Sequence, residues 1–304
     1  MRFTKSILSI AAAALLYGCV PASAPQAMEA KPTIRLATWN LEHLAVNNGT
    51  GCRPRVDADY AALRDHADRL GADVIALQEV ENEAAARRVF TPDAWTVVMS
   101  DRPDSNRGGT CGENPALKIL KQDVGFAIRK GIPFTRNPDF RDLALGNPDL
   151  RWGVDITLNL PKPIRLLSIH LKSGCNSGRA PSDADCPIIF QQGEVLERWI
   201  DARAASGEDY AILGDWNRRT ALPGDAFLAN VSDADPPGGR LVMTNAGVGA
   251  KCVARYKDFI DHIAVGERAA ARVVPGSFAE YTYGGQEDLH PSDHCPNSIA
   301  IAAR

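Results

Sequence analysis

Six short segments of the chain each run from an apolar stretch into a polar, mostly acidic end. They are TWNLE (38–42), ALQEV (76–80), SIHLKS (168–173), LGDWN (213–217), DFIDH (258–262) and PSDHC (291–295). A charged side chain at the end of a buried strand is costly unless it is paired or holds an ion. The pattern therefore predicts a fold in which an Asn, several carboxylates and two His residues lie at strand ends.

The spacing of apolar residues between these segments predicts an α/β protein. Runs rich in Val, Ile and Leu predict strands near 33–39, 73–79, 94–99, 124–129, 153–160, 164–171, 209–214, 258–265 and 297–302. Helical spacing is clearest over 57–70 and 187–204. Strands with helical cover indicate a layered sandwich. The polar stretch 100–121 and the irregular stretch 218–250 are expected to be loops.

The first residues of the chain have the pattern of an export signal. Two basic residues precede an apolar run, 7–16, that is too short to span a bilayer. We expect residues 1–24 to be a signal peptide, residues 25–32 a tether and residues 33–304 the folded domain.

Two processing routes remain open for this leader. The segment ending in Cys19 resembles a lipobox, which would place a lipid anchor on that cysteine, whereas Ala22-Ser23-Ala24 is a site for ordinary secretion. The protein is accordingly expected to be exported, as a periplasmic protein, an outer-surface lipoprotein or a secreted one.

Six cysteines follow the leader. They are Cys52, Cys111, Cys175, Cys186, Cys252 and Cys295. In an exported protein this number indicates up to three disulfides, whereas a zinc site is disfavoured because no C-x-x-C pair occurs. We expect Cys175 to pair with Cys186, since they bound a short loop whose closure contributes roughly 3 kcal/mol in the chain-entropy model.

The overall charge limits what the chain can bind through electrostatics alone. The formal net charge is −3 at pH 7, so a strongly basic nucleic-acid footprint is absent. A local rim of Arg and Lys together with divalent cations can outweigh a mildly acidic average. A nucleic-acid substrate is therefore not excluded.

The polar ends of the six segments supply the groups needed to hold a divalent metal against a phosphate. Glu42 and Glu79 offer the hard oxygens that Mg²⁺ prefers. His170 ends a buried strand, and Lys172 just after it is a donor suited to phosphate oxygens. Arg129 and Arg151 are further candidates for contact with substrate phosphates.

The remaining segments carry groups for general acid–base work. Asp215 and Asn217 can flank one point in space, where a carboxylate orients or deprotonates water and an amide binds a phosphoryl oxygen. Asp261 and the Asp293-His294 pair place carboxylates beside an imidazole, which fixes its tautomer and orientation. The combined inventory indicates metal-dependent phosphoester cleavage.

In order and in type, the six segments resemble the endonuclease/exonuclease/phosphatase superfamily, which includes deoxyribonuclease I, abasic-site endonucleases, bacterial sphingomyelinases and inositol polyphosphate phosphatases. The resemblance covers the chain from about residue 34 to 301 and is nearest to a secreted bacterial nuclease-like branch. It implies a four-layer α/β sandwich, with two mixed β-sheets packed face to face between helices and the site at one edge of the sheets.

The resemblance also implies roles along the chain: Asn40 and Glu42 in the first acidic segment, Glu79 as the Mg²⁺ ligand, His170 as the phosphate-binding histidine, Asp215 as water activator, Asn217 as transition-state donor, and Asp261, Asp293 and His294 as the late carboxylates and imidazole. Asn40 and Asp293 are added as expected metal ligands, and Asn40 also as a substrate contact. Asp123 is the candidate carboxylate partner of His170. Trp216 and His262 depart from common family residues and are expected to pack rather than react.

These inferences favour an exported Mg²⁺-dependent phosphodiesterase, a nuclease acting on DNA, with Mn²⁺ or Ca²⁺ as alternative ions. One alternative keeps the chemistry and changes the substrate, as in sphingomyelinase-like enzymes or other phosphoesterases of this fold. A second alternative is a non-catalytic binding module. No obligate protein partner is evident from the sequence.

Overall fold

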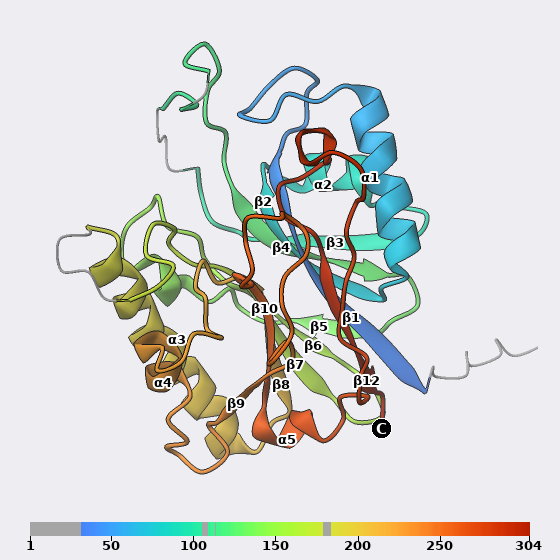
Figure 1. Ribbon diagram of the computed structural model, residues 1–304. Coiled ribbons are helices and arrows are strands. Elements are labelled where there is room, and N and C mark those ends of the chain that lie inside the picture. The colour runs from blue at the N-terminus through green and yellow to red at the C-terminus, as the bar shows by residue number, and fades with distance from the viewer. Residues whose placement is uncertain (1–31, 105–108, 113, 179–183) are drawn as a thin grey trace, which may run out of the picture.

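Two six-stranded sheets stacked face to face form the centre of the protein, and helices cover their outer faces (Figure 1). The computed structural model describes residues 32–104, 109–112, 114–178 and 184–304. The expected signal peptide, Cys19 and all but the last residue of the expected tether lie outside these residues. None of the helices in the described ranges is long and apolar enough to cross a membrane.

Both sheets are mixed, each with one parallel pair of strands near its middle. The first has the order β11-β12-β1-β2-β4-β3, with bounds β1 Thr33–Leu44, β2 Val74–Val80, β3 Trp95–Met99, β4 Asp123–Arg129, β11 Ala279–Glu280 and β12 Asn297–Ala302. The second has the order β5-β6-β7-β8-β10-β9, with bounds β5 Phe134–Arg136, β6 Val154–Leu158, β7 Ile164–His170, β8 Tyr210–Asp215, β9 Leu241–Met243 and β10 Asp261–Gly266. The parallel pairs are β1 with β2 and β7 with β8.

Three apolar layers hold the sandwich together. The central layer joins the inner faces of the two sheets and includes Leu36, Phe126 and Leu213. A second layer packs the first sheet against α1 (Asp57–Leu70) and α2 (Glu83–Val89). The third packs the second sheet against α3 (Cys186–Ser206) and α4 (Ala226–Val231). The expected four-layer α/β sandwich is confirmed.

Short elements account for the differences from the expected secondary structure. All the expected strands and both expected helices are present, but residues 218–250, expected to be a loop, contain α4 and β9. Also unexpected are α2, β5, β11, α5 (Glu267–Ala270) and the 3-10 turns η1 (Arg141–Ala144) and η2 (Glu287–Leu289). Elements of two to seven residues are too short to show a periodic apolar pattern.

Three disulfides tie the loops at the site edge to the sandwich. Cys175 pairs with Cys186, as expected, and their Cα atoms are 4.9 Å apart. Cys52 pairs with Cys111, and Cys252 pairs with Cys295. The last disulfide joins the loop before β10 to the residue that follows His294.

The strand register brings the polar segment ends to one edge of the sandwich. β7 and β8 run parallel, so His170 lies opposite Asp215. β10 runs antiparallel to β8, and its first residue, Asp261, also lies opposite Asp215. In the facing sheet, Asn40 of β1 lies opposite Gln78 of β2, one residue before Glu79.

Gly214 precedes Asp215 at this edge, and a side chain at position 214 is expected to destabilise the fold. Its φ is 155°, and a Cβ atom would overlap the carbonyl oxygen of Ile169 on β7. We expect Gly214→Ala to lower the free energy of unfolding by about 2–4 kcal/mol. Urea unfolding measures this. Gly112→Ala, where a Cβ meets no atom within 4 Å, is the control and should change stability little; equal effects of the two substitutions would contradict the expectation.

Candidate active site

Asn40 connects carboxylates from both sheets at the centre of the site. Its Nδ2 donates to Glu79 Oε1 at 3.2 Å and to Asp215 Oδ2 at 3.1 Å. Its Oδ1 accepts the backbone N–H of Glu42 at 2.9 Å. Glu79 comes from β2, Asp215 from β8 and Asn40 from β1, so one amide fixes the spacing of three strands from two sheets.

The backbone is strained where these side chains leave their strands. Non-glycine residues with positive φ include Glu42 (44°), His43 (53°), Glu79 (58°) and Asn217 (50°). The pairing of β1 with β2 also shifts register between Asn40 and Leu44. Such conformations cost about 1–3 kcal/mol each and persist only where the surroundings impose them. Their concentration at this edge marks it as a functional site.

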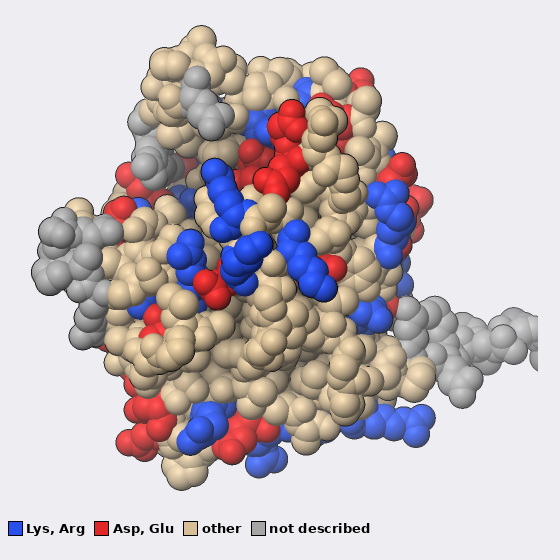
Figure 2. All heavy atoms as spheres, viewed as in Figure 1, with Lys and Arg blue, Asp and Glu red and all other residues tan. Residues whose placement is uncertain are grey.

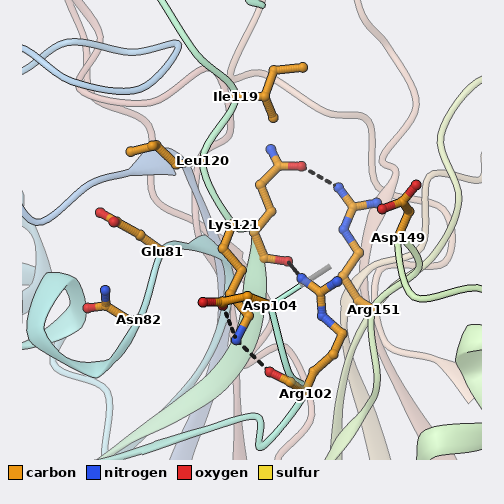
Figure 3. A pocket seen from close by; sticks show the side chains of 10 residues that line it. Glu81, Asn82, Arg102, Asp104, Ile119, Leu120, Lys121, Asp149 and Arg151 are labelled. Carbon is orange, nitrogen blue, oxygen red and sulfur yellow. Dashed lines mark hydrogen bonds and ion pairs between the residues drawn. The ribbon is translucent and has the colours of Figure 1, made fainter. Parts of the chain in front are cut away.

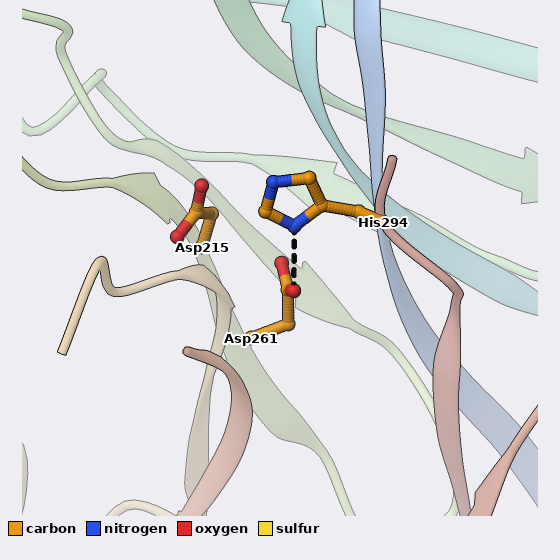
Figure 4. Close-up of side chains that lie close together, drawn as sticks. All are labelled: Asp215, Asp261 and His294. Atoms are coloured by element: carbon orange, nitrogen blue, oxygen red, sulfur yellow. Dashed lines mark hydrogen bonds and ion pairs between the residues drawn. The ribbon is translucent and has the colours of Figure 1, made fainter. Parts of the chain in front are cut away.

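Asp261 and His294 form an ion pair beside Asp215 (Figure 4). Asp261 Oδ2 lies 2.7 Å from His294 Nδ1. Burial lowers the pKa of His294, but the charge and hydrogen bond of Asp261 together with the charges of Asp215 and Asp293 raise it by more, so the pKa lies well above its ordinary value. The imidazole is therefore protonated at neutral pH, with Nδ1 held by Asp261 and Nε2 directed elsewhere.

Asp215 and His170 lie side by side in a fully enclosed part of the site. His170 Nε2 is 3.4 Å from Asp215 Oδ2. Burial, followed by the charge of Asp261, raises the pKa of Asp215 to about 7. Burial also lowers the pKa of His170 well below its ordinary value, so this imidazole is neutral. Asn217 supports Asp215 by donating its backbone N–H to Oδ1 at 2.8 Å.

Glu42 adds a further, partly buried carboxylate on the side of the first sheet. Its Oε2 accepts the backbone N–H of Asp293 at 3.0 Å and lies 3.5 Å from Arg53 Nε. Burial, followed by the charge of Asp293, raises the pKa of Glu42 to about 7. By contrast, the charges of His43, Arg151 and His294 outweigh the effect of burial on Glu79 and lower its pKa.

Glu42, Glu79 and Asn40 offer side-chain oxygens of the kind that bind a divalent cation. These groups offer carboxylate and amide oxygens, the ligands that Mg²⁺, Mn²⁺ and Ca²⁺ bind. The raised pKa of Glu42 shows that its charge lacks sufficient compensation from the protein alone. Asp293 lies next to Glu42 and can complete the set.

A second possible metal site consists of Asp215, Asp261 and His294, whose ligand atoms lie within 4.8 Å of one another. Asp261 Oδ1 is buried and has no hydrogen-bond partner among the described residues, so it is open to a ligand. A metal at this cluster would have to displace the proton of His294, because a protonated imidazole cannot coordinate a metal.

Several residues at the site had not been singled out from the sequence. His43 donates its backbone N–H to Glu79 Oε2 at 3.1 Å, and Gln122 Nε2 lies 2.9 Å from the same oxygen. Arg151 reaches this group as expected, with Nη2 donating to Gln122 Oε1 at 2.6 Å. A cavity of about 400 Å³ opens here, with Glu81 and Asn82 across from Arg151 (Figure 3).

Three expected site residues make contacts other than the expected ones. Asp123 does not contact His170, because its carboxylate pairs with Arg102 Nε at 2.9 Å and Lys121 Nζ at 2.8 Å. The expectation for Asp123 is thus corrected, and His170 Nδ1 has no partner among the described residues.

The two remaining corrections concern basic residues. Arg129 lies at the opposite end of β4 from Asp123, over the ring of Trp95 and 3.1 Å from Asp68, so it does not reach the site. Lys172 follows β7, but its ammonium is engaged by Asp185 at 2.8 Å. Arg151, the third expected basic contact, is connected to Glu79 through Gln122.

A layer of buried polar contacts holds the His294 segment against β1. Ser292 Oγ donates to the carbonyl of Asn40 at 2.8 Å and accepts the N–H of His294 at 3.2 Å. The hydroxyl of Tyr283 donates to the His294 carbonyl at 2.7 Å and accepts from Trp39 Nε1 at 2.8 Å. These contacts link the position of the imidazole to the strand that carries Asn40.

The packing residues behave as expected. Trp216 is fully buried and packs edge-on against Phe227 and His262. His262 is also buried, with Nε2 2.8 Å from the carbonyl of Arg218. Neither side chain contacts the acidic cluster directly.

The sandwich and its acidic, His-containing edge define a phosphoesterase and nuclease-like class of protein. The sequence profile of the Endonuclease/Exonuclease/phosphatase family matches residues 37–294, and the chain belongs to this family. Its members are generally metal-dependent phosphoester hydrolases. A search of curated proteins gave no significant match.

Solved structures of the same fold are similar at low sequence identity. TDP2 from C. elegans aligns with a TM-score of 0.61 and 13% identity over 89% of this chain and 75% of its own. The human Nocturnin catalytic domain aligns with a TM-score of 0.58 and 13% identity, over 89% of this chain and 94% of its own. AP endonuclease LMAP from Leishmania major aligns with a TM-score of 0.53 and 19% identity, over 89% of this chain and 88% of its own. These likenesses support the fold.

Removal of one carboxylate is expected to abolish metal binding while leaving the fold intact. A saturating divalent cation should raise the melting temperature of the protein by about 5 °C, because binding stabilises only the folded state. Glu79→Gln should lose most of this shift. Differential scanning calorimetry with Mg²⁺, Mn²⁺ and EDTA measures it.

The matched control for this experiment is Asp68→Asn, which removes an exposed carboxylate on α1 that pairs with Arg129 at the far end of β4. It should keep the full metal-dependent shift. An equal shift in Glu79→Gln and in the unmodified protein would rule out Glu79 as a ligand.

His66, which packs on Tyr283 behind the site, is expected to make folding pH-dependent. Their ring centroids are 4.5 Å apart, and burial lowers the pKa of His66 to about 4. Below pH 6.5 His66 binds a proton in the unfolded chain but not in the folded protein, because folding lowers its pKa. The free energy of unfolding therefore falls as the pH drops from 6.5 towards 4. Between pH 7 and 5 the loss is about 2 kcal/mol.

Urea unfolding of the unmodified protein and His66→Gln at both pH values tests this expectation. The variant has no titrating group at this position, so its stability should fall by about 2 kcal/mol less over the same interval. Identical pH dependence in the two proteins would contradict the assignment, whatever their absolute stabilities.

Proposed function

We propose that the protein is an exported, Mg²⁺-dependent phosphodiesterase that hydrolyses phosphodiester bonds in DNA. The observation that carries the proposal is the arrangement around Asp215. A carboxylate with a pKa near 7 lies between a neutral His170 and the protonated His294. A base and a cationic donor thus face the same small volume.

Asp215 is suited to accept a proton from the attacking water. A general base works best when its pKa lies near the working pH, and the pKa of Asp215 is about 7. Asn40 and the backbone N–H of Asn217 each donate to this carboxylate and fix its orientation. The oxygen that accepts the proton is therefore held in place before the substrate binds.

His294 is suited to stabilise negative charge on the phosphoryl group. Asp261 holds Nδ1, so the proton on Nε2 is available to a phosphoryl oxygen. His170 is neutral and can donate one further hydrogen bond to phosphate without adding charge. These donors are fixed by the protein, which lowers the reorganisation needed in the transition state.

A divalent ion would be held by Glu42 and Glu79, with Asn40 and Asp293 beside them. When bound, such an ion polarises the phosphoryl oxygen and offsets the charge that develops on it. Asn217 lies on the opposite side of Asp215, where its Nδ2 donates to the carbonyl of Leu171 at 3.2 Å. Rotation of this amide would let it reach a phosphoryl oxygen.

Export is supported by the cysteines and by the apolar leader. All six cysteines after the leader form disulfides, a state that oxidising compartments outside the cytosol maintain. The choice between a lipid anchor on Cys19 and ordinary secretion depends on residues 16–24.

DNA is favoured as the substrate over a lipid headgroup for two reasons. Lys and Arg side chains gather in the middle of the face that carries the loop before β10 (Figure 2), and such groups bind a polyanionic backbone. Among the similar structures, one is named an AP endonuclease and another the endonuclease domain of the TRAS1 retrotransposon. A sphingomyelinase-like activity remains the second candidate.

Loss of the base is expected to abolish cleavage without unfolding the protein. Asp215→Asn should lower the rate of plasmid nicking with Mg²⁺ by about 10³-fold, because the amide cannot accept the proton. His294→Gln should cause a loss of similar size, and EDTA should stop the reaction. Agarose-gel assays of supercoiled DNA measure the rate, and circular dichroism checks the fold.

The same preparations are assayed on RNA, sphingomyelin and a phosphomonoester, with Asp68→Asn as the control that should keep full activity. Hydrolysis of sphingomyelin alone would replace DNA by a lipid substrate. Full nicking activity in Asp215→Asn would overturn the proposed mechanism.

A further inference from the structure

A second cavity of about 250 Å³ opens between the candidate site and the loop formed by residues 250–260. Asp261 and His294 border it on the side of the site. Its other walls include Arg219, Arg255, Tyr256 and Phe259. Of the lining residues, the reaction described above uses Asp261, His294 and Asp293, so the walls formed by Arg219, Arg255, Tyr256 and Phe259 are available to another part of the substrate.

Tyr256 is the most unusual residue of this cavity. Its exposed fraction is 45%, and among the described residues it is the only aromatic side chain in the group of exposed large apolar ones. The guanidinium carbon of Arg255 lies 4.7 Å from the centre of its ring. A single exposed Tyr is ordinary on a protein surface. An exposed Tyr that lines a cavity next to a reactive imidazole is suited to ligand binding.

The loop around Tyr256 is basic. Lys251, Arg255 and Lys257 are all exposed, and Arg219 contributes a further cation from the opposite wall. Glu280 also lines the cavity, but its carboxylate accepts the N–H groups of Lys251 and Cys252 at 2.8 and 3.0 Å. Much of its negative charge is therefore engaged by the loop backbone rather than directed at a ligand.

The loop is also held in a fixed position relative to His294. The disulfide from Cys252 to Cys295 connects it to the residue next to the imidazole. Within the loop, Ala250 N donates to the carbonyl of Lys257 at 2.9 Å, and Tyr256 N donates to that of Val253 at 3.0 Å. A ligand group on Tyr256 would thus sit at a defined distance from the reacting phosphate.

We propose that the cavity binds an unpaired nucleotide next to the scissile phosphate, with its base stacked on Tyr256 and its phosphate held by Arg219 and Arg255. The proposal rests on the proposed function and adds to it a preference for unpaired over duplex DNA at the cleaved bond. Aromatic rings between basic residues bind single strands in this way. In a duplex the faces of each base are covered by its neighbours, so Tyr256 would have no face to stack on.

The lining of the cavity carries both signs of charge, with Arg219 and Arg255 as well as Asp258, Asp261, Glu280 and Asp293. The two guanidinium groups supply the positive charge near Tyr256, and that of Arg255 lies 4.7 Å from the centre of the ring. A phosphate carried next to a planar base satisfies both the cations and the ring.

The test compares a single-stranded deoxyoligonucleotide with the same strand carrying abasic residues around one cleavable bond. The unmodified protein should prefer the normal strand by about ten-fold in kcat/KM, the effect expected from one stacked base. Tyr256→Ala should bring the ratio of the two kcat/KM values close to one. Tyr256→Phe retains the ring and should keep the preference, as should Arg198→Ala on the exposed surface of α3.

An unchanged ratio in Tyr256→Ala would overturn the stacking subsite while leaving the proposed function intact. Absence of cleavage of every strand by the unmodified protein would instead refute the proposed function. In that case fluorescence anisotropy of the labelled normal strand, with the unmodified protein and with Tyr256→Ala, still decides the subsite. Equal affinities in the two proteins would reject it, and about ten-fold weaker binding by the variant would support it.

Discussion

Negative charge crowded at one edge of two stacked sheets is the constraint on which the site depends. Glu79, Asp215 and Asp261 come from three different strands, and without compensation their mutual repulsion would push these strand ends apart. The protein meets part of this repulsion with Asn40, which donates to two of the carboxylates, and with the cationic His294. The remainder is the physical reason that a divalent cation fits this edge.

The loops next to the site hold the strand ends that carry these charges in fixed positions. Arg55 is buried and donates to the carbonyls of Leu41 and Glu42 at the end of β1 and to that of Pro291 in the late loop. Ser292 makes a second link between the same segments. The disulfide between Cys252 and Cys295 adds a covalent link close to these contacts. Strained φ angles at the strand ends can persist because these contacts leave the backbone little alternative.

The sequence predicted the place of a site residue where its position along its own strand was enough to locate it. It did not do so where the location depended on the direction of that strand in the sheet. Asp123 and Arg129 bound the same apolar run, and either end was compatible with a site. Because β4 runs antiparallel to β2, the Asp123 end lies toward the site and Arg129 lies far from it. The partner of Cys252 was likewise undetermined, since loop spacing does not fix which distant segments meet. The acidic segments were placed correctly because the resemblance supplied their order.

The division between sheet edge and loops also separates reactivity from substrate choice. Groups that can handle the phosphate lie on or next to β1, β2, β7, β8 and β10, where neighbouring strands restrict any change. Tyr256 and the basic residues around it lie on a loop that contacts the site through one disulfide and a few backbone hydrogen bonds. Such a loop can change its side chains without disturbing the ion pair of Asp261 and His294. In the proposed function, substrate preference is thus assigned to the loop before β10 and reactivity to the strand register.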